Sequence, residues 1–215
     1  MEKIILTSII ISGVSLVIAI LTLYKTLLKP SNISVLIGPE IQVCHHNFPK
    51  LATGLYVPVT FINTSPNIGA IFKCAITIFR TDAPQQKFFM FWRDFTRISV
   101  DSNWKSDWKH DEQAHSFAVN GKSSISKIVW FPWFGDSKPK LHFKQGDYTL
   151  IVNLWVGRDK KPKNSAFNFH ITQELEALFQ NRINTQSNTT IMIMLNKELD
   201  RNKILTNHEY KSLLE

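Results

Sequence analysis

The chain has 215 residues, with 25 Lys and Arg against 17 Asp and Glu, and a formal net charge of +8. Its mean hydropathy of -0.09 would fit a basic soluble domain, but the apolar residues are concentrated at the N-terminus, which excludes a uniformly soluble chain. The roughly 185 residues that follow are enough for one packed core and too few for two. We predict a transmembrane anchor helix over 1–29, a β-sandwich domain over 30–196 and a C-terminal helix or tail over 197–215.

The first segment, Ile4 to Tyr24, carries no charged residue and consists mainly of Ile, Leu and Val. A helix of this length crosses the roughly 30 Å hydrocarbon core of a bilayer. It is followed by Lys25 and Lys29, which can reach lipid phosphates, and by Pro30, which ends helices. Because no small-x-small cleavage site follows, we predict a retained single-pass anchor rather than a cleaved signal peptide.

Small residues recur along the anchor at alternating spacings of four and three. They are Ser8, Ser12, Ser15, Ala19, Thr22 and Thr26. A seam of this kind lets helices approach closely in lipid, so it predicts self-association into a homo-oligomer. The alternative is that the hydroxyls bond to carbonyls one turn back in the same helix.

The lysines that flank the anchor do not decide its orientation, because both sides carry them. Cys44 and Cys74 are too few for a disulfide-built exterior domain. Without the three lysines and one glutamate of the anchor and its flanks, residues 30–215 hold 22 basic and 16 acidic residues, a formal +6. This charge suits an anionic cytoplasmic leaflet, so we predict a cytoplasmic β-sandwich.

Beyond Pro30, short β-branched and aromatic runs alternate with turn residues. The runs cover residues 33–37, 41–43, 55–62, 70–79, 87–92, 116–119, 123–130, 148–156, 166–171 and 191–195. This spacing, without long helices between the runs, predicts an all-β-dominated, antiparallel sandwich. Pro58 should put its strand at an edge or mark a bulge. Thr172 can cap a short helix over 174–182, and a second, more polar helix from about 197 fits the pattern as well.

The segment from Phe143 to Val152 resembles the turn-into-strand of immunoglobulin-like domains. Gly146 and Tyr148 take the places of a Gly-x-Tyr step in which the tyrosine hydroxyl bonds back across a corner. Leu150 stands where a cysteine is usual, so the resemblance is to disulfide-free sandwiches. It implies an immunoglobulin-like fold and no particular function.

Enzyme and cofactor motifs are not matched. Gly121-Lys122-Ser123 lacks the upstream glycine of a phosphate loop, since Ser116 stands there, and the Asn-Gly pair predicts a tight hairpin turn instead. Cys44 and the two histidines after it do not have metal-ligand spacing. We therefore predict no catalytic residues, no metal and no cofactor, and we expect a non-enzymatic protein.

The most distinctive polar stretch carries Trp104 and Trp108, four residues apart, with Arg93 and Arg97 nearby. On a helical turn the two indoles would share one face, and Trp and Arg are preferred anchors at interfaces. We predict that these four residues form a surface for a protein partner encoded nearby. The alternative is that the indoles fold back over the core. Acidic residues in the same stretch oppose direct nucleic-acid binding.

Two lysine-rich loops bracket one predicted strand and offer positive charge to lipid headgroups or to an anionic partner. With the anchor lysines, the set is Lys25, Lys29, Lys138, Lys140, Lys160, Lys161 and Lys163. The alternative is that the loop lysines are simply solvated, and salt-sensitive liposome binding would separate the two interpretations.

The layout of one span, a Lys-Pro exit and a basic β-sandwich has three sequence landmarks: Gly54–Asn63, Gly121–Lys127 and Gly146–Leu150. It resembles a group of small bacterial membrane proteins, some of which are similar to membrane effectors of antiphage systems of the retron type. The resemblance implies an effector of the cell inner membrane, whose cytoplasmic sandwich receives a signal or partner and whose spans gather to disturb the bilayer. A membrane-tethered adaptor that holds a cytosolic protein is the alternative.

Overall fold

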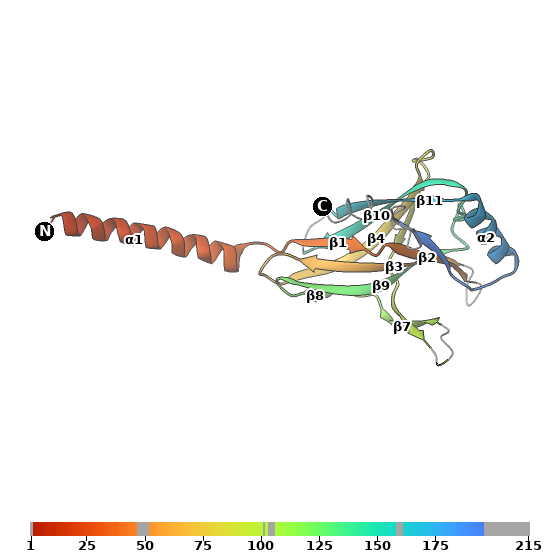
Figure 1. The fold of residues 1–215 in the computed structure, drawn as a ribbon, viewed down its shortest axis with the longest axis horizontal. Helices are drawn as coiled ribbons and strands as arrows, with labels where there is room; N and C mark the ends of the chain where they lie inside the picture. The colour runs from red at the N-terminus through yellow and green to blue at the C-terminus, as the bar shows by residue number, and fades with distance from the viewer. Residues whose placement is uncertain (1, 47–51, 101, 103–105, 158–160, 196–215) are drawn as a thin grey trace, which may run out of the picture.

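A computed structural model describes residues 2–46, 52–100, 102, 106–157 and 161–195. Helix α1 (Glu2–Leu23) projects from one end of a β-domain and continues into a turn of π-helix, η1 (Tyr24–Leu28) (Figure 1). The stretch Thr7–Thr26 is 20 residues long, has a mean hydropathy of 2.1 and is apolar enough to cross a membrane. The predicted N-terminal apolar helix is therefore confirmed.

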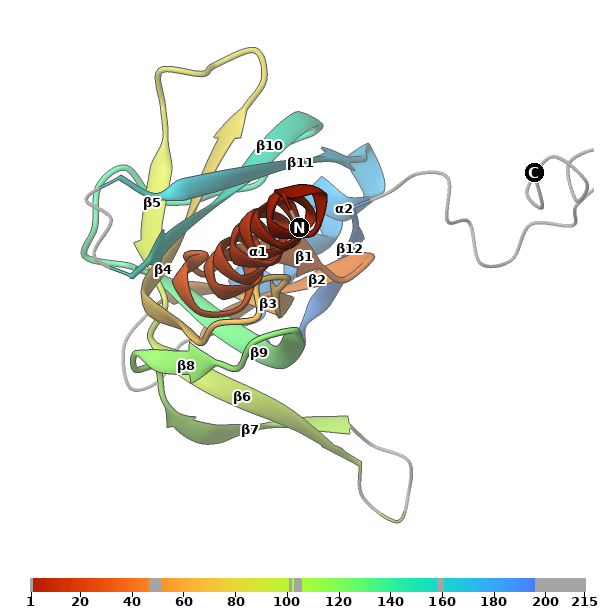
Figure 2. The same ribbon diagram turned by 90° about the vertical axis from the view of Figure 1, so that its left-hand side faces the viewer.

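The β-domain consists of two antiparallel sheets, which Figure 2 views from the end at which α1 projects. The first contains β1 (Ile33–Ile37), β2 (Glu40–His46), β3 (Ala52–Asn63), β6 (Asp94–Val100), β7 (Ser106–Gln113), β9 (Ser123–Phe134) and β12 (Ile191–Met194). The second contains β4 (Gly69–Arg80), β5 (Phe88–Phe91), β8 (Phe117–Val119), β10 (Gly146–Val156) and β11 (Lys163–Ile171). Their orders are β12-β2-β3-β9-β6-β7, with β1 also paired to β3, and β11-β10-β4-β5, with β8 also paired to β4. The predicted all-β-dominated, antiparallel architecture is confirmed, and the immunoglobulin-like topology stays a prediction.

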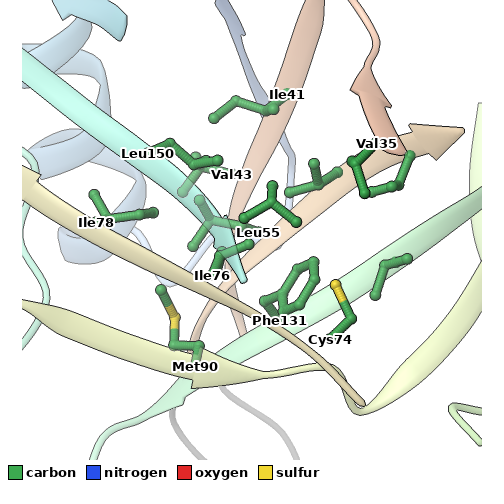
Figure 3. Close-up of a cluster of buried hydrophobic side chains, with 14 of the residues drawn as sticks. Val35, Ile41, Val43, Leu55, Cys74, Ile76, Ile78, Met90, Phe131 and Leu150 are labelled. Atoms are coloured by element: carbon green, nitrogen blue, oxygen red, sulfur yellow. The ribbon is translucent and has the colours of Figure 1, made fainter. Parts of the chain in front are cut away.

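One apolar core fills the space between the two sheets. Leu55 of β3 and Phe131 of β9 lie against Ile76 of β4, and Leu150 of β10 is close by (Figure 3). These side chains meet in the core because alternate residues of each strand point to the same face of its sheet. Each such side chain contributes about 1.5–3 kcal/mol when it is fully buried.

Pro58 lies inside the first sheet rather than at its edge, so the predicted edge placement is wrong. On one side β3 pairs with β9 throughout, and on the other side it pairs first with β2 and then with β1. Pro58 sits at the gap between these two partners, where its carbonyl accepts from Gly38 N at 2.9 Å. At this gap no neighbouring strand needs a hydrogen bond from the backbone nitrogen of residue 58. A proline, which has no N–H, therefore loses no hydrogen bond of the sheet there.

Two predicted local features are present at the end of the β-domain opposite α1. Helix α2 (Gln173–Asn184) is capped by Thr172, whose side chain accepts from Leu175 N at 3.3 Å. The hydroxyl of Tyr148 accepts a 2.9 Å hydrogen bond from Lys144 N, so the expected bond across the corner forms. The second helix predicted from about 197 lies outside the described residues.

Two local features differ from the patterns considered above. A helical turn would have put the two indoles on one face, but the stretch contains the hairpin β6–β7, whose residues pair from Asp94↔Gln113 to Val100↔Ser106. The Asn-Gly turn before Lys122 does not form a hairpin: β8 pairs with β4, whereas β9 pairs with β3, so the turn crosses from one sheet to the other. Lys122 has a positive φ of 52° in this turn.

Candidate functional site

The described side chains of α1, from Thr7 onward, are all exposed and none is covered by the β-domain. Ser8, Ser12, Ser15, Ala19 and Thr22 fall within an arc of about 80° at 100° per residue. We call this arc the small-residue stripe. Thr26 Oγ1 donates to Thr22 O at 2.7 Å, so for Thr26 the alternative of a bond within the helix is the one observed.

The helix enters the β-domain without a flexible linker. Lys29 caps η1 through its backbone N–H, which donates to Tyr24 O at 2.8 Å. The two residues are five apart in sequence, as in the hydrogen bond of a π-helix. The carbonyl of Lys29 in turn accepts from Asn67 Nδ2 at 2.7 Å and from Ser65 Oγ at 3.5 Å. The residue that caps the helical segment is therefore held by the loop between β3 and β4.

A buried polar network fixes that loop. Asn63 and Ser65 are 1% and 0% exposed. Asn63 Nδ2 donates to Asn67 O at 2.7 Å and to Val119 O at 3.1 Å, while its Oδ1 accepts from Ser65 N at 3.1 Å. Because buried amides must find partners, these contacts leave the loop few alternative conformations.

The segment after the helix is held as well. Thr64 N donates to Asn32 O at 3.0 Å, Asn32 Nδ2 donates to Thr64 Oγ1 at 3.1 Å, and Lys163 Nζ donates to Asn32 Oδ1 at 3.3 Å. A Cβ on Gly121 would overlap the carbonyl oxygen of Pro66, so these turns are packed backbone to backbone. We call residues 29–32 with the turns around them the junction.

The predicted lysines are divided between the two ends of the β-domain. The two lysine-rich loops do bracket β10, and its 11 residues separate them by about 35 Å. Lys161 and Lys163 lie at the end that also carries Lys25 and Lys29, where they fit a headgroup role, whereas Lys138 and Lys140 lie in the loop before β10 at the opposite end. Lys160 lies outside the described residues.

The predicted partner surface is only partly formed. Trp108 stacks on Tyr56, with ring centroids 4.4 Å apart and planes 20° from parallel, so this indole packs back onto the sheet. Arg93 lies over the ring of Phe134, 5.3 Å from its centroid, and Arg97 is exposed. Trp104 lies outside the described residues.

An exposed aromatic surface that the sequence analysis did not single out lies on the second sheet. Phe89 and Phe91 of β5 are 43% and 51% exposed, and their rings are 5.0 Å apart. Trp155 of β10 lies 6.2 Å from Phe91. The alternation of the run Phe88 to Phe91 was the available signal, since it puts every second residue, Phe89 and Phe91, outside.

The thiols are poorly suited to chemistry. Burial raises the pKa of Cys44 and of Cys74 to about 12, and the two cysteines are not bonded to each other. Cys44 Sγ lies 2.9 Å from Asn188 O, to which it donates. In the part of the chain that the structure describes, no three His, Cys, Asp or Glu side chains converge as a metal site would require.

No protein-family model matches the sequence, and no curated protein matches it. Among solved structures, the chain is similar to a crystal structure assigned as the ApaA protein of Bordetella pertussis, with 7% identity, a TM-score of 0.31 and coverage of 79% of this chain and 98% of that chain. A structural-genomics target designated SoR45 is similar at 7% identity and a TM-score of 0.26, over 83% of this chain and 95% of that chain. The function is therefore argued from the residues of the site.

Proposed function

We propose that the protein is a non-enzymatic effector of the bacterial inner membrane, of the kind that serves retron-type antiphage systems. Its cytoplasmic β-domain receives a signal or partner and controls the self-association of its own transmembrane helix, which perturbs the bilayer. The junction carries this proposal. A helix that only anchors a domain needs no ordered contact with it, whereas a domain that acts on its helix needs a rigid connection.

The small-residue stripe supplies the helix–helix contact in this proposal. Small side chains allow two helices to approach closely in lipid, where the hydrophobic effect does not drive association. The stripe carries no charge, so gathered spans would disturb lipid packing rather than form a polar, conducting wall. Rotation or tilt of the β-domain would turn the helix, and with it the small-residue stripe, because Lys29 and the π-turn connect the two.

Expression of stripe variants in bacterial cells tests the proposal. Strong expression of the unaltered chain should arrest growth and depolarise the membrane, as measured with a potential-sensitive dye. Ser12→Leu with Ala19→Leu should restore growth. Gly13→Leu is the matched control, since Gly13 lies about 140° from Ser8 around the helix and also changes from small to large. Equal toxicity of all three proteins, at equal membrane abundance, would remove the stripe from the mechanism.

The exposed aromatic surface favours a second candidate, a membrane-tethered adaptor. Phe89, Phe91 and Trp155 offer the large, rigid side chains that dominate binding at protein interfaces. A Gly-Ser-Gly-Ser insertion after Lys29 distinguishes the candidates. It should abolish toxicity if the junction transmits a signal, and it should leave partner binding intact if the helix is only a tether.

A further inference from the structure

A cavity of about 280 Å³ lies at the end of the β-domain opposite α1. Helix α2, strands β2 and β12 and the segment before β10 enclose it. Its apolar wall is formed by Val43, Leu141, Phe143, Phe179, Ile183 and Ile191. Its polar lining includes His45, His142, Lys144, Arg182 and Glu176. We call this cavity the distal pocket; its volume, at the lower end of the range for ligand sites, fits one small molecule.

The lining is positive because of a short alternating segment. Leu141 and Phe143 are 3% and 4% exposed, since both insert into the core. Because neighbouring residues of an extended segment point in opposite directions, His142 and Lys144 point away from the core. Both side chains are exposed and lie at the rim of the pocket. The sequence Leu-His-Phe-Lys over residues 141–144 thus builds an apolar floor and a basic rim from four consecutive residues.

Arg182 is the most informative residue of the lining. Its Nη1 donates to Ser187 Oγ at 3.2 Å, whereas its Nε is buried and has no hydrogen-bond partner among the described residues. Among the described residues of the lining, Glu176 is the one acid; it accepts from Gln145 N at 2.8 Å and forms no ion pair with Arg182. The charge of the guanidinium is therefore not balanced by a carboxylate of this lining, and a bound anion would balance it.

We propose that the distal pocket binds a small organic anion that carries a carboxylate or phosphate group on an apolar or aromatic body. The oxyanion faces the positive charges of Arg182 and Lys144, with His142 at the rim, and the body lies against the side chains of Phe143 and Phe179. The guanidinium is suited to this task because its donors are planar and permanently charged. This site is independent of the small-residue stripe and of the junction.

Binding to the full chain in phosphatidylcholine nanodiscs tests the proposal, with phenyl phosphate and benzoate as probes and ligand-detected NMR as the readout. Both anions should bind saturably. Benzamide, which has the aromatic ring without the charge, and inorganic phosphate, which has the charge without the ring, should bind at least about tenfold more weakly. Binding of phenyl phosphate but not benzoate would assign a phosphate ligand, and the reverse would assign a carboxylate.

Two variants locate the binding. Arg182→Met keeps an unbranched apolar stem, removes the charge and should weaken both anions at least about tenfold, or about 1.4 kcal/mol. Lys73→Met is the control, since it also removes one positive charge and Lys73 is exposed on β4, outside the pocket lining. Should Arg182→Met fail to fold, His142→Glu, a change at an exposed rim position, is expected to abolish binding. Absence of saturable binding to the unaltered chain, or equal binding by it and by the folded pocket variant, overturns the proposal.

Discussion

The side-chain amide of Asn67 donates a 2.7 Å hydrogen bond to the backbone carbonyl of Lys29 and so joins the β3–β4 loop to the end of the N-terminal helical segment. The last carbonyls of a helix are usually left to water or to a local cap. Here one of them is bound by a side chain 38 positions away in the sequence. The C-terminal end of the helical segment is thus a part of the folded β-domain.

Asn67→Ala should loosen the junction. It removes the bond to Lys29 O and should cost about 1 kcal/mol of unfolding free energy. The sharper expectation is local: the backbone amides of Lys29, Ser31 and Asn32 should exchange with deuterium faster, and the toxicity expected of the effector should fall. Asn164→Ala, at an exposed position of β11, is the control. Unchanged exchange at residues 29–32 would contradict a role of Asn67 in the rigidity of the junction.

Gly121→Ala should destabilise the β-domain by about 1–3 kcal/mol, because the added methyl group would overlap Pro66 O and force two turns apart. Thermal unfolding followed by circular dichroism measures this. Gly13→Ala is the matched control, since a Cβ at Gly13 meets nothing within 4 Å. Equal midpoints for the two variants would show that the turns separate without cost.

Trp108→Ala tests whether the indole is structural. Loss of the stack on Tyr56 should lower the unfolding free energy by about 1–2 kcal/mol, and Trp108→Phe should recover a large part of it. Urea unfolding of the three proteins gives the comparison. A Trp108→Ala protein of unchanged stability that loses a protein partner would instead support the predicted partner surface.

His45 should make stability depend on pH. Burial is the main cause that lowers its pKa from the ordinary value of 6.5, and the positive charges of His142 and Lys140 lower it further. The unfolded chain therefore takes up this proton more readily, so the stabilisation is complete above pH 6.5 and is lost as the pH falls through the lower pKa of the folded state. Compared with the unaltered chain, His45→Gln should lose less stability between pH 7.5 and pH 5. Parallel melting curves against pH would refute this.

The orientation of the β-domain can be measured directly. A C-terminal green fluorescent protein should fluoresce and a C-terminal alkaline phosphatase should be inactive if the domain is cytoplasmic, because each reporter folds on one side of the inner membrane. The opposite pattern would place the β-domain outside the cytoplasm and would exclude a cytosolic signal.

Strands with a buried face were predictable and polar ones were not. The run from Tyr148 to Val156 alternates clearly, and β10 covers it. By contrast, β7 reads Ser-Asp-Trp-Lys-His-Asp-Glu-Gln and lies at the edge of its sheet, so it carries little of the apolar pattern that identifies strands. Its hairpin with β6 depends on pairing with β9, which is a tertiary effect that local sequence does not report.

The two candidate sites also differ in how far they could be predicted from the sequence. The small-residue stripe is periodic in sequence and could be found there. The distal pocket joins His45, His142 and Arg182, which are far apart along the chain and meet only because β2, the segment before β10 and α2 converge. The predicted lysines are close in sequence but do not form one cluster, since the loops at the two ends of β10 lie at opposite ends of the β-domain.

The length of β10 places the distal pocket far from the end of the β-domain where α1 leaves. About 35 Å of strand separates it from the end where α1 leaves, which is several times the Debye length of about 8 Å at physiological ionic strength. Anions are depleted next to a negatively charged lipid surface, but at this height the surface potential has decayed. The pocket would therefore sample the bulk concentration of its ligand, and its occupancy would not change with the lipid composition beneath it.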